Sequence, residues 1–117
     1  MRDLKAFIRD NLPVAPVPGI PEIRLHKAVP SSRIARLAAE DADFGTPYWA
    51  YYWAGGLALA RYVLDNPEAV AGRRVLDLGA GAGLVGIAAA KAGGASVIAA
   101  EVDAYAVAAL EMNVALN

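Results

Sequence analysis

The chain has 117 residues, of which 57% are hydrophobic, and this is enough for one domain with a buried core. A formal net charge of −1 gives no electrostatic reason to expect a nucleic acid or an anionic membrane as partner. The lack of cysteine excludes disulfides and thiolate metal sites, and a single histidine excludes any motif that needs two. Since no secretory signal or membrane span is recognisable, we expect a soluble, cytoplasmic protein.

An N-terminal arm with a helix is predicted over residues 1–46. The arm begins with a short amphipathic helix that ends near Asn11, because apolar side chains recur there at i, i+3 and i+4: Leu4, Phe7 and Ile8. Residues 12–21 contain four prolines, which disfavour a helix. They favour a stiff polyproline II connector, with a proline-groove ligand as the minor alternative.

The arm continues with an extended segment and a second helix. Residues 22–26 alternate polar and apolar side chains, as an edge strand does, and His26 falls on the polar phase. We therefore expect His26 on the surface. A helix is predicted over residues 33–42, with Ser31 or Ser32 as its N-cap.

An aromatic segment follows over residues 48–53, which hold both tryptophans and three of the five tyrosines. Aromatic side chains bury large areas, so the segment can be part of the core. It can also wall a pocket for a planar ligand, with the adjoining Gly55 and Gly56 keeping the approach open. The two interpretations are compatible, and a helix is predicted to follow over residues 57–64.

The remaining sequence predicts a strand, a helix, a second strand and a second helix. The strands are expected at residues 75–78 and 96–101, and the helices at 84–92 and 104–116. This order predicts a right-handed βαβ unit with a parallel sheet, hence an α/β fold. At the start of the last helix, Asp103 is expected to act as the N-cap.

The glycine loop after the first of these strands fits two ligands. Residues 81–86 satisfy the dinucleotide pattern G-x-G-x-x-G, with Glu101 about where a ribose-binding acid is expected. This reading predicts an NAD(P)- or nucleotide-binding Rossmann module of an oxidoreductase. A second pattern, D-x-G-x-G-x-G, is formed by Asp77, Gly79, Gly81 and Gly83, and it resembles the signature of class I methyltransferases that use S-adenosylmethionine.

The position of Asp77 favours the second pattern. An acid at the end of the strand would repel a pyrophosphate bound at the following helix N-terminus. S-adenosylmethionine instead carries a sulfonium and an ammonium group, and a carboxylate suits this ligand. Glu101 closes the second strand, where its two oxygens can accept both hydroxyls of a ribose. The alternative role for Asp77 is that it only caps the loop.

A resemblance to a more specific family of methyltransferases is carried by residues 47–67 and the arm segment 21–26. Together with residues 75–83, 99–103 and 113–117, they resemble the lysine methyltransferases that act on the β subunit of electron transfer flavoprotein. The resemblance implies a Rossmann-like class I methyltransferase fold whose S-adenosylmethionine-binding domain occupies residues 47–117. It also implies a protein substrate with an acceptor lysine, such as that β subunit.

Site roles are carried over from this resemblance. Asp77 and the three loop glycines, Gly79, Gly81 and Gly83, would hold the methionine part of S-adenosylmethionine, and Glu101 would hold the ribose. Trp53 and Gly55 would lie beside the cofactor, while Tyr48 and Trp49 would face the lysine channel. No metal ligand and no catalytic residue is assigned.

The sequence departs from the family at Asn117, where the family continues into further strands and a catalytic loop. We therefore expect only the N-terminal part of the fold, which would be inactive alone and would bind S-adenosylmethionine weakly or not at all. The missing C-terminal half, or self-association, would cover the unpaired edges of the sheet. The remaining alternative is a non-catalytic binding or assembly domain whose sheet edge recruits another chain.

Overall fold

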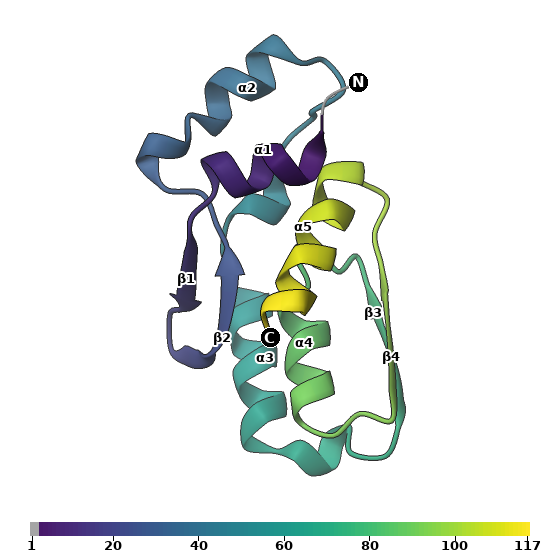
Figure 1. Cartoon of the computed structure of the whole chain (residues 1–117). Coiled ribbons are helices and arrows are strands. Elements are labelled where there is room, and N and C mark those ends of the chain that lie inside the picture. The colour runs from purple at the N-terminus through teal and green to yellow at the C-terminus, as the bar shows by residue number, and fades with distance from the viewer. Residues whose placement is uncertain (1–2) are drawn as a thin grey trace.

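The computed structural model describes residues 3–117 and shows three layers, with helices between a β-hairpin and a two-stranded sheet (Figure 1). The layer of α3, α4 and α5 touches the hairpin on one side, and α4 packs on the sheet on the other. Three 3₁₀ turns lie at Pro30–Ser32, Tyr48–Ala50 and Pro67–Ala69. The main elements are α1 (Leu4–Asn11), β1 (Val14–Val17), β2 (Ile20–His26), α2 (Ile34–Glu40), α3 (Ala54–Asp65), β3 (Arg74–Leu78), α4 (Leu84–Lys91), β4 (Ser96–Ala100) and α5 (Ala104–Leu116).

The βαβ unit predicted from the sequence is confirmed. Strands β3 and β4 run parallel, with Val75 opposite Val97 and Asp77 opposite Ala99. Helix α4 connects them and packs closely on the sheet at Gly86, where an added Cβ would come within 3.2 Å of the Asp77 carboxylate. A side chain at this position would push the helix away from the strand that carries the acid.

The proline-rich connector was predicted wrongly. Residues 14–17 form β1, which pairs antiparallel with β2 through a tight turn at Gly19. Proline is tolerated in a strand at a sheet edge, because the missing N–H then leaves no partner unpaired. Val17 and Ile20 flank the turn and are buried against the helices, so hydrophobic burial outweighs the polyproline II preference.

The surface position predicted for His26 is also wrong. His26 is only 6% exposed, and its Nδ1 lies 2.7 Å from the carbonyl oxygen of Leu12. The alternation of the strand ends at this point, since Leu25 and His26 are both buried. The chain between α1 and β1 covers the outer face of the strand there, which removes His26 from solvent.

The predicted cap of the second helix is wrong as well. The Ser32 hydroxyl accepts a hydrogen bond from the backbone N–H of Val29, within the preceding 3₁₀ turn. Arg33 occupies the N-cap position in a left-handed conformation, with φ of 55° and no side-chain capping bond. Helix α2 therefore begins at Ile34, later than predicted, and ends at Glu40.

Two asparagines, one on α5 and one directly after it, join the hairpin to the helices. Asn113 is completely buried; its Oδ1 accepts from the His26 N–H at 2.8 Å, and its Nδ2 donates to the Ala82 carbonyl at 2.9 Å. Asn117 accepts from the N–H of Arg24 and donates to the carbonyl of the same residue. The Asn113 amide thus connects β2 directly to the glycine loop.

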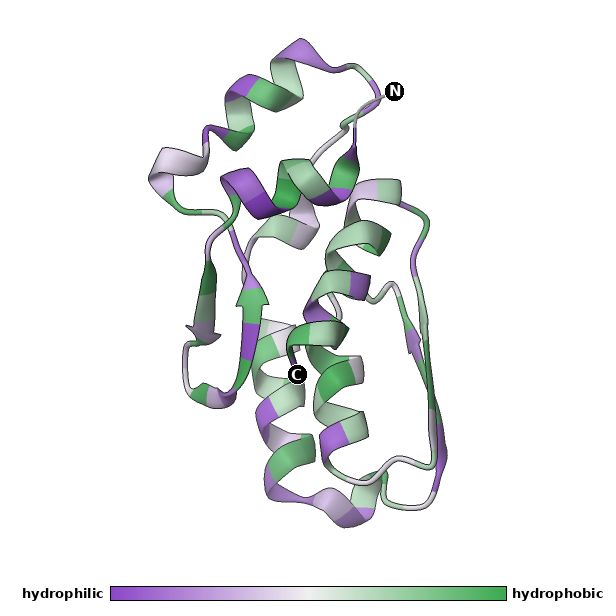
Figure 2. Ribbon diagram, in the orientation of Figure 1, coloured by the Kyte–Doolittle hydropathy of each residue, from purple (hydrophilic) through white to green (hydrophobic). Residues whose placement is uncertain are grey.

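The outer face of the β3–β4 sheet is apolar and exposed. Leu76, Leu78 and Ile98 point away from α4 and are 64%, 81% and 64% exposed. Figure 2 shows hydrophobic residues along both strands on this side of the molecule. Among the described residues, no helix is long and apolar enough to cross a membrane.

The first prediction concerns the buried amide. Asn113→Leu keeps the side-chain volume but leaves the N–H of β2 and the loop carbonyl unpaired. Each buried unsatisfied group costs about 1–3 kcal/mol, so we expect the free energy of unfolding to fall by roughly 2–4 kcal/mol. Urea denaturation monitored by circular dichroism measures this free energy of unfolding. Asn66→Leu, at a surface amide that reaches only the Tyr62 carbonyl, is the matched control; a loss below about 0.5 kcal/mol in Asn113→Leu would contradict the prediction.

Candidate functional site

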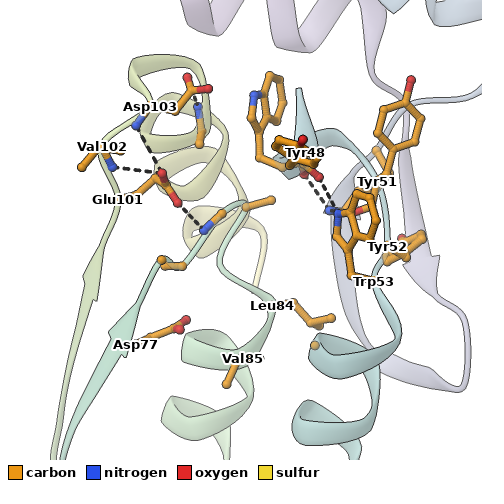
Figure 3. A pocket seen from close by; sticks show the side chains of 18 of the residues that line it. Tyr48, Tyr51, Tyr52, Trp53, Asp77, Leu84, Val85, Glu101, Val102 and Asp103 are labelled. Carbon is orange, nitrogen blue, oxygen red and sulfur yellow. Dashed lines mark hydrogen bonds between the residues drawn. The ribbon is translucent and has the colours of Figure 1, made fainter. Parts of the chain in front are cut away.

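A cavity of about 530 Å³ opens between the glycine loop and the aromatic segment. The loop, the end of β4 and the start of α5 form one wall, and residues 48–53 form the opposite wall (Figure 3). Of the residues predicted to bind the cofactor, those that line this pocket are Asp77, Gly79, Gly81, Glu101 and Trp53, and Tyr48 and Trp49, predicted to face the lysine channel, line it as well. Gly83 and Gly55 lie outside its lining, and Gly56 borders it in place of Gly55.

The glycine loop approaches the pocket with its backbone. Gly79, Gly81 and Gly83 have φ values of 71°, 56° and 96°, a region that side chains with a Cβ rarely adopt. At Gly79 an added Cβ would meet nothing within 4 Å, so the loop leaves this part of the pocket open. Gly83 turns instead toward Leu110 and forms the N-cap of α4.

The Glu101 carboxylate is held by the backbone around it (Figure 3). Its Oε2 accepts from Gly81 N–H at 2.8 Å, and its Oε1 accepts from Val102 N–H at 2.9 Å and Asp103 N–H at 3.2 Å. Burial raises the pKa of Glu101, but these hydrogen bonds outweigh it and hold the pKa below its usual range. The group is therefore a fixed anion, and a carboxylate has about four acceptor positions, so it can still take a hydroxyl from a ligand.

Asp77 lies on the face of β3 that packs against α4. Its Oδ2 accepts from the Gly86 N–H at 3.0 Å, in the first turn of that helix. Burial raises the pKa of the Asp77 carboxyl; the Gly86 hydrogen bond opposes this, and the negative charge of Glu101 adds to it. In the described part of the chain, no hydrogen bond is made by the other carboxylate oxygen. A cationic group of a ligand would stabilise the ionised form.

Asp103 caps α5 as predicted. Its Oδ1 accepts from Tyr105 N–H at 2.8 Å and from Ala106 N–H at 3.3 Å. Asp103 and Glu101 both line the pocket, and the capping bonds of Asp103 leave Glu101 as the acid after β4 that we assign to a ligand. Among residues 3–117, no group of three or more histidines or acids could hold a metal ion.

The aromatic segment lies partly in the core and partly on the wall of the cavity. Trp49 is buried in the core and stacks on Tyr105, with the two rings 6.4 Å apart and 10° from parallel. Tyr48 and Trp53 are exposed at the pocket, and the Trp53 indole donates to the Tyr48 carbonyl at 2.8 Å. The segment thus has one aromatic ring in the core and others on the pocket wall.

One residue of the pocket was missed by the sequence analysis. Lys27, just beyond β2, is only 7% exposed and also lines the cavity. A single lysine 50 positions before Asp77 belongs to no recognisable motif. Only the folding of the hairpin against α5 brings it to the aromatic segment.

Comparison with known proteins identifies the family of the chain. The sequence model of the lysine methyltransferase family matches residues 41–117. The electron transfer flavoprotein β-subunit lysine methyltransferase of Danio rerio is 47% identical over 116 residues, which are 98% of this chain and 45% of that protein. The Homo sapiens protein of the same name is 40% identical over 116 residues, 98% of this chain and 44% of that protein.

A shorter match links the chain to a second group of methyltransferases. A ribosomal protein methyltransferase of Bacillus cytotoxicus is 54% identical over 46 residues, which are 39% of this chain and 15% of that protein. The chain spans about 45% of the length of the flavoprotein-subunit methyltransferases that it matches. Because the family model covers more than half of its residues and the similarity to those relatives extends over almost all of them, the chain belongs to the lysine methyltransferase family.

Proposed function

We propose that this chain forms the cofactor-binding part of an S-adenosylmethionine-dependent protein-lysine methyltransferase. The observation that carries the proposal is the pair of carboxylates, Asp77 and Glu101, which border one cavity on either side of an open glycine loop. Both acids lie at or near the carboxyl ends of adjacent parallel strands, where open α/β sheets bind their ligands. Family membership supports methyl transfer as the reaction.

The residues fit the cofactor by chemistry. Asp77 would bind its cationic amino group, the loop from Gly79 to Gly83 would hold the methionine part, and Glu101 would accept a hydrogen bond from one ribose hydroxyl. Trp53 would border the cofactor, with Gly56 beside it in place of the predicted Gly55. When bound, S-adenosylmethionine supplies a methyl group activated by a positively charged sulfur. The chain's own residues bind and orient it, and they keep it beside the aromatic wall.

The acceptor proposed is a lysine on a protein, and the names of the relatives suggest the β subunit of electron transfer flavoprotein. Within the chain, we propose residues 1–46 as an arm with a helix and residues 47–117 as the first part of the methyltransferase domain. A cytoplasmic location is proposed from the composition alone.

A dinucleotide-binding oxidoreductase is less compatible with the same site. A pyrophosphate would need free N–H groups at the helix N-terminus and in the loop. Here the Gly86 N–H is bonded to Asp77, and the Gly81 N–H is bonded to Glu101. The two carboxylates therefore accept from N–H groups that the phosphate oxygens would need, and their negative charges would repel the pyrophosphate.

A binding or assembly role has one observation in its favour, the exposed apolar face formed by Leu76, Leu78 and Ile98. An apolar face on a strand pair can be covered by another polypeptide or by a second copy of the chain. Gel filtration that gives a stable dimer or hetero-complex, lost in Leu76→Lys, would favour this role.

The second prediction tests the ligand. We expect S-adenosylhomocysteine, but not NADH, to shift the backbone amide signals of the glycine loop in NMR titrations of the chain. Asp77→Asn should weaken binding about tenfold or more, because a charge-assisted hydrogen bond contributes about 1.5–3 kcal/mol. Asp43→Asn, at an exposed acid outside the pocket, is the matched control. Equal shifts with NADH, or unchanged affinity in Asp77→Asn, would contradict the proposal.

The third prediction follows from the raised pKa of Asp77. A cationic ligand prefers the ionised carboxylate, so affinity for S-adenosylhomocysteine should be full above this pKa and fall as the pH drops through it. The fall should be absent in Asp77→Asn. Since a raised pKa in the folded state means that ionisation costs stability at neutral pH, the thermal midpoint of Asp77→Asn should equal or exceed that of wild type. Calorimetry measures both the affinity and the thermal midpoint. An affinity that stays constant at acid pH would refute this role of Asp77.

A further inference from the structure

Lys27 is the one lysine side chain at the proposed cofactor pocket, and its ammonium group is bound to the aromatic segment. Nζ donates to the Trp49 carbonyl at 2.7 Å and to the Tyr51 carbonyl at 3.0 Å. The same nitrogen lies 5.0 Å from the centre of the Tyr52 ring, within the range of a cation–π contact. Lys27 therefore touches three of the six residues of the segment.

The contacts of Lys27 supply hydrogen-bond donors to carbonyl groups at the end of the 3₁₀ turn Tyr48–Ala50. Trp49, Ala50 and Tyr51 lie at the end of the turn, where carbonyls lack partners within the turn. The Ala50 carbonyl accepts from the N–H of Ala28 at 3.0 Å, and Lys27 takes the carbonyls on either side of it. Two consecutive residues that follow β2 thus bind three consecutive carbonyls of the aromatic segment.

The charge of Lys27 is not neutralised by an acid. Within residues 3–117, no carboxylate forms an ion pair with it, and burial lowers its pKa to about 8. A buried ammonium without a carboxylate partner is costly, and here carbonyl dipoles and an aromatic ring are its compensation. An apolar side chain of the same length could fill the space but could not bind the carbonyls.

We propose that Lys27 is a positioning residue of the cofactor pocket, whose ammonium group fixes the carbonyls of Trp49 and Tyr51 and thereby holds residues 48–53 in place as the wall opposite the glycine loop. This inference rests on the proposed function, because it assigns to that wall a part in binding the cofactor. Lys27 acts through the wall and is not assigned a contact with the reacting atoms.

The exposed rings of the wall support each other, and the Trp53 indole donates to the Tyr48 carbonyl, so the backbone carbonyls of the segment are where Lys27 contributes. Tyr48 and Trp53 contact each other, with ring centres 5.7 Å apart, and both are exposed. The other titratable side chains that line the pocket are the carboxylates of Asp77, Glu101 and Asp103 and the phenols of Tyr48, Tyr51 and Tyr52. Loss of the Lys27 charge therefore removes the cation of the pocket and weakens the bonds to the carbonyls.

The first arm of the test compares Lys27→Met with Lys5→Met, a matched change at an exposed lysine that pairs with Glu111. We expect Lys27→Met to weaken binding of S-adenosylhomocysteine at least fivefold at pH 7 and Lys5→Met to leave it unchanged. Both tryptophans of the chain lie within residues 48–53, so tryptophan fluorescence reports on this segment and on the core around Trp49. Lys27→Met should shift this emission while far-ultraviolet circular dichroism stays that of wild type.

The second arm uses pH and does not depend on the variant folding. In wild type, the tryptophan emission and the NMR signal of the Lys27 ε-carbon should change together with a midpoint near 8. The affinity of wild type for S-adenosylhomocysteine should fall over the same range. The ligand's own amino group also titrates there and affects wild type and Lys27→Met alike, so the fall should be larger in wild type than in Lys27→Met. A tryptophan emission that stays constant while the Lys27 ε-carbon signal titrates would overturn the inference.

The outcomes separate this inference from the proposed function. If wild type binds S-adenosylhomocysteine and Lys27→Met binds it equally well with unchanged emission, Lys27 does not position the wall and the proposed function stands. If wild type does not bind the ligand, the proposed function fails and the assignment of Lys27 to the cofactor pocket fails with it. In that case the emission still shows whether Lys27 holds the segment.

Discussion

The buried amide of Asn113 is the interaction on which the arrangement of the pocket depends. It lies on α5 and binds the backbone of β2 with its oxygen and the Ala82 carbonyl with its nitrogen. Ala82 is inside the glycine loop, so one side chain fixes the hairpin, the last helix and the loop relative to one another. Because both polar ends are satisfied, the amide can be buried without the cost of an unpaired group. The hairpin in turn brings Lys27 to the aromatic segment, which places the second wall of the pocket.

The chemistry of the site follows from where its acids sit. In many α/β proteins, the N–H groups at the loop and helix N-terminus are free to bind phosphate. Here the carboxylates of Asp77 and Glu101 accept hydrogen bonds from two of these N–H groups, and they place two negative charges at the pocket. The loop geometry is that of a nucleotide site, while the electrostatics favour a ligand with a positive group and ribose hydroxyls. S-adenosylmethionine has both features.

The sequence predicted the cofactor half of the fold better than the arm. The parallel strands and their glycine loop carry strong local signals, and the Asp103 cap was correct because capping depends on neighbours in sequence. The proline-rich connector and the surface position of His26 were predicted wrongly, since both depend on tertiary packing: Val17 and Ile20 pack against α3 and α4, and the chain between α1 and β1 covers His26. Lys27 was missed for the same reason: its partners are backbone carbonyls, which leave no pattern in the sequence.

A crystal structure of the chain with S-adenosylhomocysteine tests the central claim most directly. We expect a ribose hydroxyl within hydrogen-bond distance of the Glu101 carboxylate, the ligand's amino group beside Asp77, and Trp53 against the bound molecule. A ligand found outside the pocket, or one that contacts neither acid, would contradict the account.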